Sequence, residues 1–255
     1  MEDITINTDR EISGAKQTFV LVHGAWQAPY AWDGVKNDLV KEGYEVVAIQ
    51  LPGHGTDDTD YKTLHMESYI NYVSNAITAI GSKVILVGHS MAGIIISGVA
   101  EQIPELVEKL VYIAAYVPAN GQSAYALSLL DKQSQLGASL IVSEDQSEFD
   151  VVKADIINVF AQDASAATQQ LILDNYKSEP AAPFGDPVVL TDGNFGKVAK
   201  YFVETLEDHG IGNDLQKEMI AAAGIKNVYT LNTGHTPALS QPEEVSNILK
   251  QIAGQ

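Results

Sequence analysis

One short turn constrains the fold of this chain more than any other feature. Two glycines bracket it in the sequence GHSMAG at 88–93, and it joins two apolar runs, 83–87 and 91–102. The continuous apolar residues of the first run indicate a buried strand, and the second run is typical of a helix. Glycine at 88 leaves room for that helix to pack close to the strand. We therefore predict a tight, strained strand–turn–helix unit with Ser90 as a nucleophile.

Strand and helix patterns alternate along the chain on both sides of this turn. Continuous apolar strands that alternate with helices are typical of a parallel sheet covered by helices on both faces. The expected strands are 18–22, 46–51, 83–87, 106–115, 198–205 and 227–231, and the expected helices are 30–41, 66–80, 91–102, 213–223 and 242–253.

The alternation stops between about residues 120 and 192. Segments there have the patterns of helices or loops, with no convincing buried strand before Val188. An insertion of this length inside a repeating sheet predicts a helical cap over one edge, since long connections usually carry function. We expect a single domain over 1–255, with its core at 18–119 and 193–255 and the cap at about 120–192.

Composition excludes several classes of function. The formal net charge is −18, so nucleic acid and anionic membrane surfaces are unfavourable partners. The chain has no cysteine, which excludes disulfides and cysteine-built zinc sites, and no apolar run of membrane-spanning length. Residues 1–17 are polar and lack the apolar centre of a signal peptide. We expect a cytoplasmic protein by default, with an exported mature protein as the alternative.

A serine nucleophile needs a base and an acid that orients the base. Only two histidines follow Ser90, and His235 lies in a loop between the last strand and the last helix, at the carboxyl edge of the sheet. We expect His235 to be the base and His209 to be a surface loop residue. Asp208 follows the preceding strand and is the expected acid. Glu207 and Asp192 are the alternatives.

The substrate is expected to bind between these residues and the cap. The second oxyanion donor of such folds comes from a loop after an early strand, so the backbone N–H groups of Ala25 and Met91 are the predicted pair. The expected substrate-pocket residues, which rest on position alone, are Gly24, Trp26, His89, Tyr125, Phe160 and Thr236.

These residues together resemble the plant methylesterase and hydroxynitrile lyase branch of the α/β-hydrolases, which includes salicylate-binding methylesterase, and its bacterial esterase relatives. The matching stretches are VLVHGAW, LPGHG, KVILVGHSMAG, KYFVETLEDHGI and GHTPALSQPEEV, at 20–26, 51–55, 83–93, 200–211 and 234–245. The resemblance implies an α/β-hydrolase fold with an eight-stranded sheet and an inserted helical cap. It also implies a triad that maps onto Ser90, Asp208 and His235, with no metal and no cofactor.

Two chemistries share this triad within the branch. The resemblance implies that a lyase carries a lysine directly after the triad histidine and a threonine after the first strand, where this chain has Thr236 and Gly24. A neutral threonine cannot stabilise departing cyanide, so we expect a serine carboxylesterase that acts on small to medium, largely apolar esters as a monomer or homodimer. A hydroxynitrile lyase and a catalytically silent small-molecule receptor are the alternatives. The entrance is HGAWQAPYAW at 23–32, bulkier and stiffer than the small, glycine-rich residues that the resemblance implies, so the substrates of the relatives do not carry over directly.

Overall fold

A computed structural model describes residues 17–255, and the polar stretch that lacks a signal-peptide pattern lies outside them except for Gln17. The centre of the molecule is a six-stranded sheet in the order β2-β1-β3-β4-β8-β9, and every pairing in it is parallel. Its strands are β1 (Thr18–Val22), β2 (Glu45–Ile49), β3 (Val84–His89), β4 (Val107–Ile113), β8 (Ala199–Thr205) and β9 (Asn227–Leu231).

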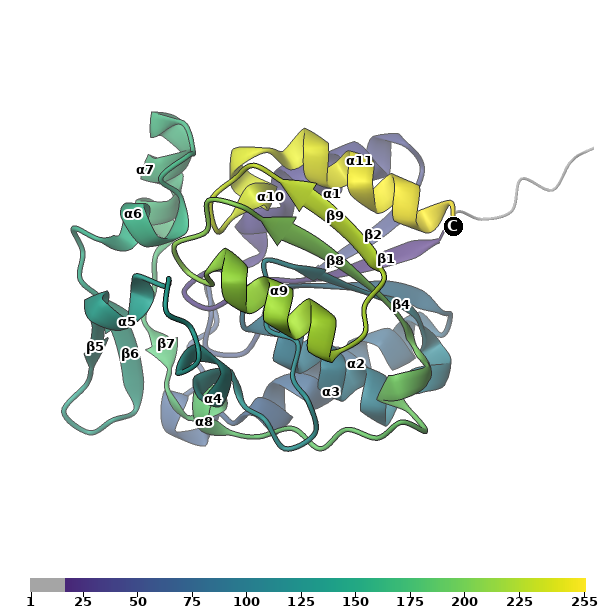
Figure 1. The fold of residues 1–255 in the computed structure, drawn as a ribbon, viewed down its shortest axis with the longest axis horizontal. Coiled ribbons are helices and arrows are strands. Elements are labelled where there is room, and N and C mark those ends of the chain that lie inside the picture. Colours follow the sequence, from purple (N-terminus) through teal and green to yellow (C-terminus); the bar gives the residue numbers. More distant parts are fainter. Residues whose placement is uncertain (1–16) are drawn as a thin grey trace, which may run out of the picture.

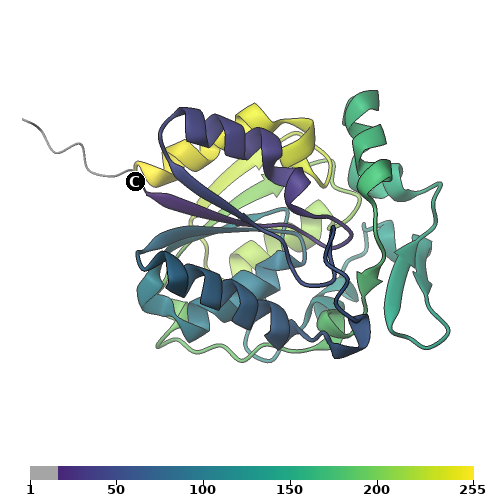
Figure 2. The same ribbon diagram turned by 180° about the vertical axis from the view of Figure 1, so that it is seen from behind.

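Helices cover both faces of this sheet (Figures 1 and 2). On one face lie α1 (Asp33–Lys41), α10 (Pro237–Ser240) and α11 (Pro242–Ala253), and on the other lie α2 (Met66–Ile80), α3 (Ala92–Gln102) and α9 (Asn213–Ala222). Four short 3-10 helices complete the core connections, at Pro29–Trp32, Tyr61–Thr63, Pro104–Leu106 and Phe195–Lys197.

Alternation along each central strand divides the core into two layers. Phe19 and Leu21 of β1 pack with α1 and α11, while Val20 and Val22 pack with α2 and α3. Both sets are fully buried, which explains why these strands have continuous apolar sequences rather than alternating ones. Because the strands between these two layers are parallel, their carboxyl ends lie at one edge of the sheet.

The sheet differs from expectation in strand number and at its edge. Residues 17–255 contain six strands of the central sheet, not the eight that the resemblance implied. The strand expected at 46–51 is β2, which is displaced by one residue at its start and lies at the sheet edge. Its side chains are alternately exposed and half-buried, because an edge strand is covered on fewer sides than a central one.

The chain between β4 and β8, which we call the insertion, was expected to be helical, and this is wrong in part. It contains a three-stranded antiparallel sheet in the order β5-β6-β7, and Val188 lies outside any strand. Those strands have only two to four residues, and β5 and most of β6 are exposed or half-buried, so no long continuous apolar run marks them. The elements are α4 (Ala124–Ser128), α5 (Leu136–Ser139), β5 (Leu140–Val142), β6 (Glu148–Val151), α6 (Ile156–Phe160), α7 (Ala166–Asn175), β7 (Glu179–Pro180) and α8 (Ala182–Gly185).

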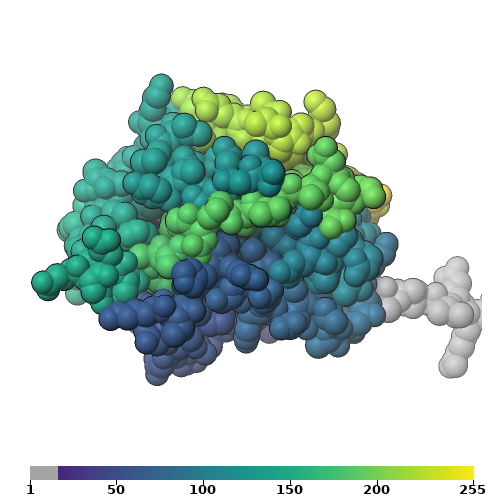
Figure 3. All heavy atoms as spheres, turned by 90° about the horizontal axis from the view of Figure 1, so that it is seen from below, coloured from purple at the N-terminus to yellow at the C-terminus, as the bar shows by residue number. Residues whose placement is uncertain are grey.

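The insertion stands beside the carboxyl edge of the central sheet (Figure 1). From α8 the chain returns to β8 along the outer side of the α2 and α3 layer, and it forms a continuous ridge on that face (Figure 3). Within residues 17–255, no helix has the length and apolarity that a bilayer crossing requires.

The tight packing of α3 generates the first prediction. A Cβ atom on Gly93 would lie 2.0 Å from the backbone oxygen of Tyr116, which neither backbone can relieve cheaply. Gly93→Ala should therefore destabilise the protein by about 3 kcal/mol or more, as severe overpacking does. Gly137→Ala is the control, because nothing lies within 4 Å of its Cβ position. Urea unfolding of both variants measures the difference, and equal stability would contradict this account.

Candidate active site

Three loops at the carboxyl edge of the sheet bring together the residues that the sequence singled out. Ser90 follows β3, Asp208 lies between β8 and α9, and His235 lies between β9 and α10. All three are buried, with relative exposures of 9%, 6% and 3%. Parallel strands end at one edge, so residues far apart in sequence meet there.

Ser90 occupies a strained turn. Its φ is +57°, in the left-handed region that side chains rarely adopt. The turn is held by close backbone packing on both sides: a Cβ on Gly88 would lie 2.9 Å from the oxygen of Ala92, and Gly93 lies against Tyr116. The carbonyl of Ser90 also accepts a hydrogen bond from the Tyr116 amide at 3.1 Å. The surrounding backbone therefore determines where the hydroxyl points.

The three side chains form a continuous chain of hydrogen bonds. His235 Nε2 lies 2.9 Å from Ser90 Oγ, and His235 Nδ1 lies 2.9 Å from both carboxylate oxygens of Asp208. Because an ionised carboxylate only accepts, Nδ1 carries the proton and Nε2 is left to accept the serine proton. This is the arrangement required of a nucleophile and its general base.

Asp208 is held as a carboxylate by other donors. Its Oδ1 accepts from the amides of Gly210 and Ile211 at 2.7 and 2.8 Å. Its Oδ2 accepts from Thr205 Oγ1 at 2.8 Å and from Gln216 Nε2 at 3.1 Å. With both oxygens occupied, the carboxylate cannot rotate away from His235, so it fixes both the tautomer and the orientation of the imidazole.

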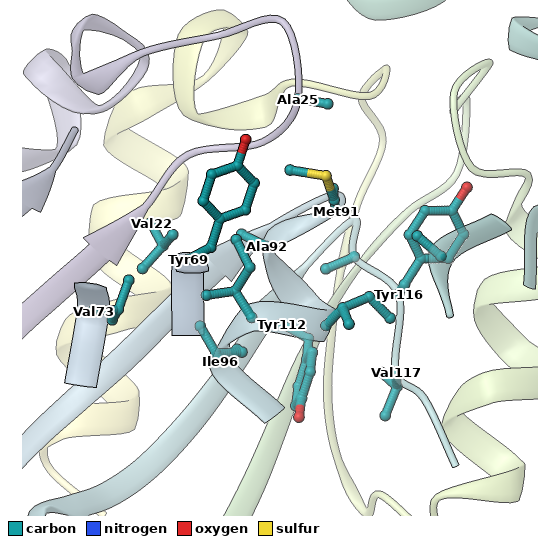
Figure 4. Close-up of a cluster of buried hydrophobic side chains, with 14 of the residues drawn as sticks. Val22, Ala25, Tyr69, Val73, Met91, Ala92, Ile96, Tyr112, Tyr116 and Val117 are labelled. Carbon is teal, nitrogen blue, oxygen red and sulfur yellow. The ribbon is translucent and has the colours of Figure 1, made fainter. Parts of the chain in front are cut away.

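Two backbone amides lie beside Ser90. Met91 follows it at the start of α3, and Ala25 lies in the loop after β1, where its neighbour Gly24 packs against Ser90 (Figure 4). Within residues 17–255, neither amide donates to a protein acceptor. Met91 is also at a helix N-terminus, where the partial positive charge favours an anion. Both amides are therefore available to a ligand, and their role as an oxyanion hole stays a prediction.

The loop after β1 is tied to the insertion by a buried charge. Trp26 has a left-handed backbone, with φ +58°, and its amide donates to Glu179 Oε2 at 2.8 Å. The same oxygen lies 2.8 Å from His54 Nε2. The indole Nε1 of Trp26 donates to the carbonyl of Phe149 at 3.1 Å. The residue after Ala25 is thus held by two segments of the insertion, β6 and β7.

Burial and its neighbours set the charge of His54. Burial alone would lower the pKa of this imidazole, but the attraction and hydrogen bond of Glu179 outweigh burial and raise the pKa above its ordinary value. The hydrogen bonds agree, because Nδ1 faces the carbonyl oxygen of Pro52 at 2.9 Å and Nε2 faces the carboxylate. Two acceptors require a doubly protonated ring.

His89 and His23 are neutral, because burial lowers the pKa of each and neither hydrogen-bonds to a carboxylate of residues 17–255. Burial and the nearby His235 lower the pKa of His89 to about 3, and its Nε2 donates to the backbone carbonyl of His235 at 2.7 Å. Burial and then His54 hold the pKa of His23 well below its usual range, and its Nε2 accepts from the Leu51 amide. His89 therefore binds the backbone of the loop that carries His235, and its place in a substrate pocket stays a prediction.

An apolar cavity of about 290 Å³ lies between the core and the insertion. Its wall meets the triad region through Tyr116, whose amide binds the Ser90 carbonyl, and through Trp26, whose ring lies 5.4 Å from that of Phe160. Asp131 is the one charged residue in its lining, and its carboxylate is occupied by backbone amides, including that of Gly212. The aromatic lining residues are Trp26, Tyr116, Tyr125, Phe149 and Phe184.

The expected pocket residues Gly24, Phe160 and Thr236 lie around the triad, and their role in binding substrate stays a prediction. A Cβ on Gly24 would lie 2.8 Å from His89 Nδ1 and 2.9 Å from Ser90 Cβ, so this glycine gives way to both. The Phe160 ring lies 6.0 Å from that of His235. Thr236 Oγ1 donates to the Phe160 carbonyl at 2.8 Å and accepts from Gln27.

The alternative acids lie away from the base. Glu207 is exposed, and its carbonyl accepts from Gln162. Asp192 is exposed in the loop before β8, next to residues that bind Glu101. His209 is partly exposed, with Nδ1 2.8 Å from the Asn158 carbonyl. Among residues 17–255, no cluster of three or more histidine, aspartate or glutamate side chains is arranged to hold a metal ion.

Sequence reasoning did not identify Glu179 or His54. Glu179 stands in a two-residue strand of the insertion, 125 positions from His54, and no local pattern links the two. The one local signal was an acidic residue directly before a proline and two positions after a lysine, which is too general to select it.

Comparisons with known proteins identify the family of this chain. The model of the "Alpha/beta hydrolase family" matches residues 19–248. Putative methylesterase 11, chloroplastic, of Arabidopsis thaliana is 31% identical over 92% of this chain, which spans 63% of that protein's length. Methylesterase 1 of Arabidopsis thaliana is 26% identical, over 93% of this chain and 96% of that protein.

A solved structure shows the same fold. The pyrethroid hydrolase PytH superposes with a TM-score of 0.83 at 23% identity, over 93% of this chain and 97% of that one. The chain therefore belongs to the alpha/beta hydrolase family, in the branch of plant methylesterases and bacterial pyrethroid hydrolases.

Proposed function

We propose that this protein is a serine carboxylesterase that hydrolyses small to medium, largely apolar esters. The observation that carries the proposal is the hydrogen-bonded chain from Ser90 through His235 to Asp208, built on a left-handed Ser90. The relatives named methylesterases support an ester as the substrate. Residues 120–192 act as the cap that separates the ester from water.

Each step of hydrolysis has a residue to perform it. Ser90 Oγ attacks the ester carbonyl carbon while His235 Nε2 takes its proton, and the amides of Ala25 and Met91 receive the oxyanion. His235 then protonates the departing alcohol, which leaves an acyl group on Ser90. The neutral imidazole next activates a water molecule, which releases the acid and restores the serine. Asp208 stabilises the imidazolium during both halves.

The cavity indicates the kind of ester. Its aromatic and aliphatic wall favours an apolar acyl or alcohol group, and its volume of about 290 Å³ suits a group the size of a phenyl ring or a short alkyl chain. The lone carboxylate in the wall, Asp131, disfavours an anionic substituent. An uncharged ester therefore fits better than a dicarboxylic monoester.

The surroundings of Thr236 favour hydrolysis over cyanohydrin cleavage. Its hydroxyl is neutral and is engaged with Phe160 and Gln27, so it supplies no positive charge beside His235. A threonine at position 24 would collide with His89 and Ser90. The two positions at which a lyase would carry lysine and threonine therefore have other residues here, Thr236 and Gly24. Release of cyanide from mandelonitrile by the purified protein would favour the lyase instead.

Replacing the nucleophile tests the proposal directly. Ser90→Ala should lower kcat on p-nitrophenyl butyrate by about 10⁴-fold or more, because the serine and its base act as a unit. It should also abolish labelling by a fluorophosphonate probe. Ser97→Ala is the control, since this buried serine of α3 bonds to Tyr112 of β4 and to no residue of the triad. Wild-type protein that resists the probe would indicate a silent receptor.

Replacing the acid separates Asp208 from the two alternative carboxylates, Asp192 and Glu207. Asp208→Asn should lower kcat by roughly 10³- to 10⁴-fold, because the amide no longer holds His235 in the productive tautomer. Asp192→Asn and Glu207→Gln should leave kcat within about twofold, since surface changes away from the site have small effects. Steady-state kinetics on one ester compare all three, and a larger loss for either control would reassign the acid.

Widening the cavity should change substrate preference. Phe149 packs against Phe184 with ring centroids 5.6 Å apart, so Phe149→Ala removes part of the apolar wall. We expect kcat/KM for a phenylacetate ester to fall about tenfold relative to acetate, as the loss of apolar contact predicts. Phe195→Ala, outside this cavity, is the control. An unchanged ratio in a p-nitrophenyl ester series would show that the ester binds elsewhere.

A further inference from the structure

We propose that Glu179, paired with His54, is a positioning residue for the oxyanion loop, the segment Gly24–Gln27. The inference rests on the proposed esterase function. Neither residue touches the reacting atoms. Each acts through the Trp26 amide, next to the Ala25 amide that is to receive the oxyanion.

The loop needs an external support at this point. Trp26 is in the left-handed region at φ +58°, a conformation that costs free energy for a residue with a side chain. Its amide points to Glu179 and not to any acceptor of its own loop. The Ala25 amide lies one peptide before this fixed point. The orientation of the Ala25 amide therefore depends on a carboxylate that comes from the insertion.

Burial of the Glu179 carboxylate costs a large desolvation free energy. Glu179 and His54 have relative exposures of 0% and 1%, and Glu179 Oε1 has no hydrogen-bond partner in the described part of the chain. Only Oε2 is used, and it serves both the Trp26 amide and His54 Nε2. An uncompensated buried carboxylate is strongly unfavourable, so the His54 imidazolium is needed to keep it in place.

The charge of the pair also matters for the reaction. A lone carboxylate next to the oxyanion loop would repel the negative charge that develops on the substrate oxygen. The imidazolium of His54 cancels that charge while it leaves Oε2 free to accept from Trp26. The pair is therefore neutral as a unit, and it orients the loop without opposing the oxyanion.

Several other titratable groups face His54. His23, in the loop after β1, has its ring centroid 4.9 Å away and is neutral. Tyr69 of α2 contacts the ring at 5.7 Å, and Lys177 of the insertion opposes its protonation at longer range. Glu179 affects the pKa of His54 more than these groups do. The pair's contribution is present at low pH and is lost as the pH rises through the raised pKa of His54.

Substitution of Glu179 tests the inference. Glu179→Ala removes the acceptor for Trp26, and we expect kcat on p-nitrophenyl butyrate to fall about 10- to 100-fold with KM within about threefold. Affinity for a trifluoromethyl ketone, which forms an oxyanion on Ser90, should fall by the same factor. Glu179→Gln keeps an oxygen that accepts from Trp26, so it should recover most of kcat while the alkaline limb that His54 causes disappears.

A matched control is available in His65 and Asp186. This pair has the same chemistry, with Nδ1 and Oδ2 2.9 Å apart, but it is exposed and lies away from the loop. Asp186→Asn should leave kcat, ketone affinity and pH profile unchanged. A merely structural role for Glu179 would lower the melting temperature of its variants and leave the ratio of ketone affinity to KM intact.

The outcomes separate the two proposals. Folded Glu179 variants with wild-type kcat and ketone affinity overturn the positioning role and leave the esterase intact. If both Glu179 variants fail to fold, His54→Gln decides: a tenfold lower kcat without the alkaline limb supports the role, and a wild-type profile overturns it. Wild-type protein that neither hydrolyses the ester nor reacts with a fluorophosphonate overturns the esterase, and the positioning role falls with it.

Discussion

The close packing of α3 against the end of β3 and the segment that follows β4 is the contact on which the site depends. Gly88 and Gly93 let backbone meet backbone, and Ser90 between them has no room for a relaxed conformation. Strain of this kind persists only where the surroundings impose it. The buried sheet supplies that rigidity, because Val84–Val87 is buried on both faces. The packing that stabilises the core thus also determines the direction of the serine hydroxyl.

A second dependence joins the insertion to the core. Glu179 from β7 holds the Trp26 amide, and the Phe149 carbonyl from β6 holds its indole. The same tryptophan lines the cavity, and its ring is tilted against that of Phe160 at 5.4 Å, while the Phe160 ring lies 6.0 Å from that of His235. One side chain therefore links the cavity, the loop after β1 and the surroundings of His235. Under the proposed function, a change in the position of the insertion would alter all three.

Local patterns predicted most of the core and the three triad positions. The bounds of α2, β9 and α11 follow from apolar periodicity and clear end signals, such as the left-handed Gly81 after α2 and Pro242 at the start of α11. The positions of Ser90, Asp208 and His235 follow from the same regularity, because each lies just beyond a recognisable strand. The strands of the insertion could not be predicted, since they are only two to four residues long and contain no apolar run beyond the three residues of β5. Glu179 could not be predicted either, because its partners are set by tertiary packing.

The four histidines around the site show how packing assigns charge to identical side chains. His23 and His89 each face one acceptor and are kept neutral by burial, while His54 faces two acceptors and is charged. His235 faces one carboxylate and one hydroxyl, so it is left with a free lone pair for the serine proton. Had His89 or His23 been charged, its repulsion would oppose protonation of His235 during the reaction. The neutral histidines thus leave Asp208 as the charge that governs the base, and the His54–Glu179 pair adds no net charge to it.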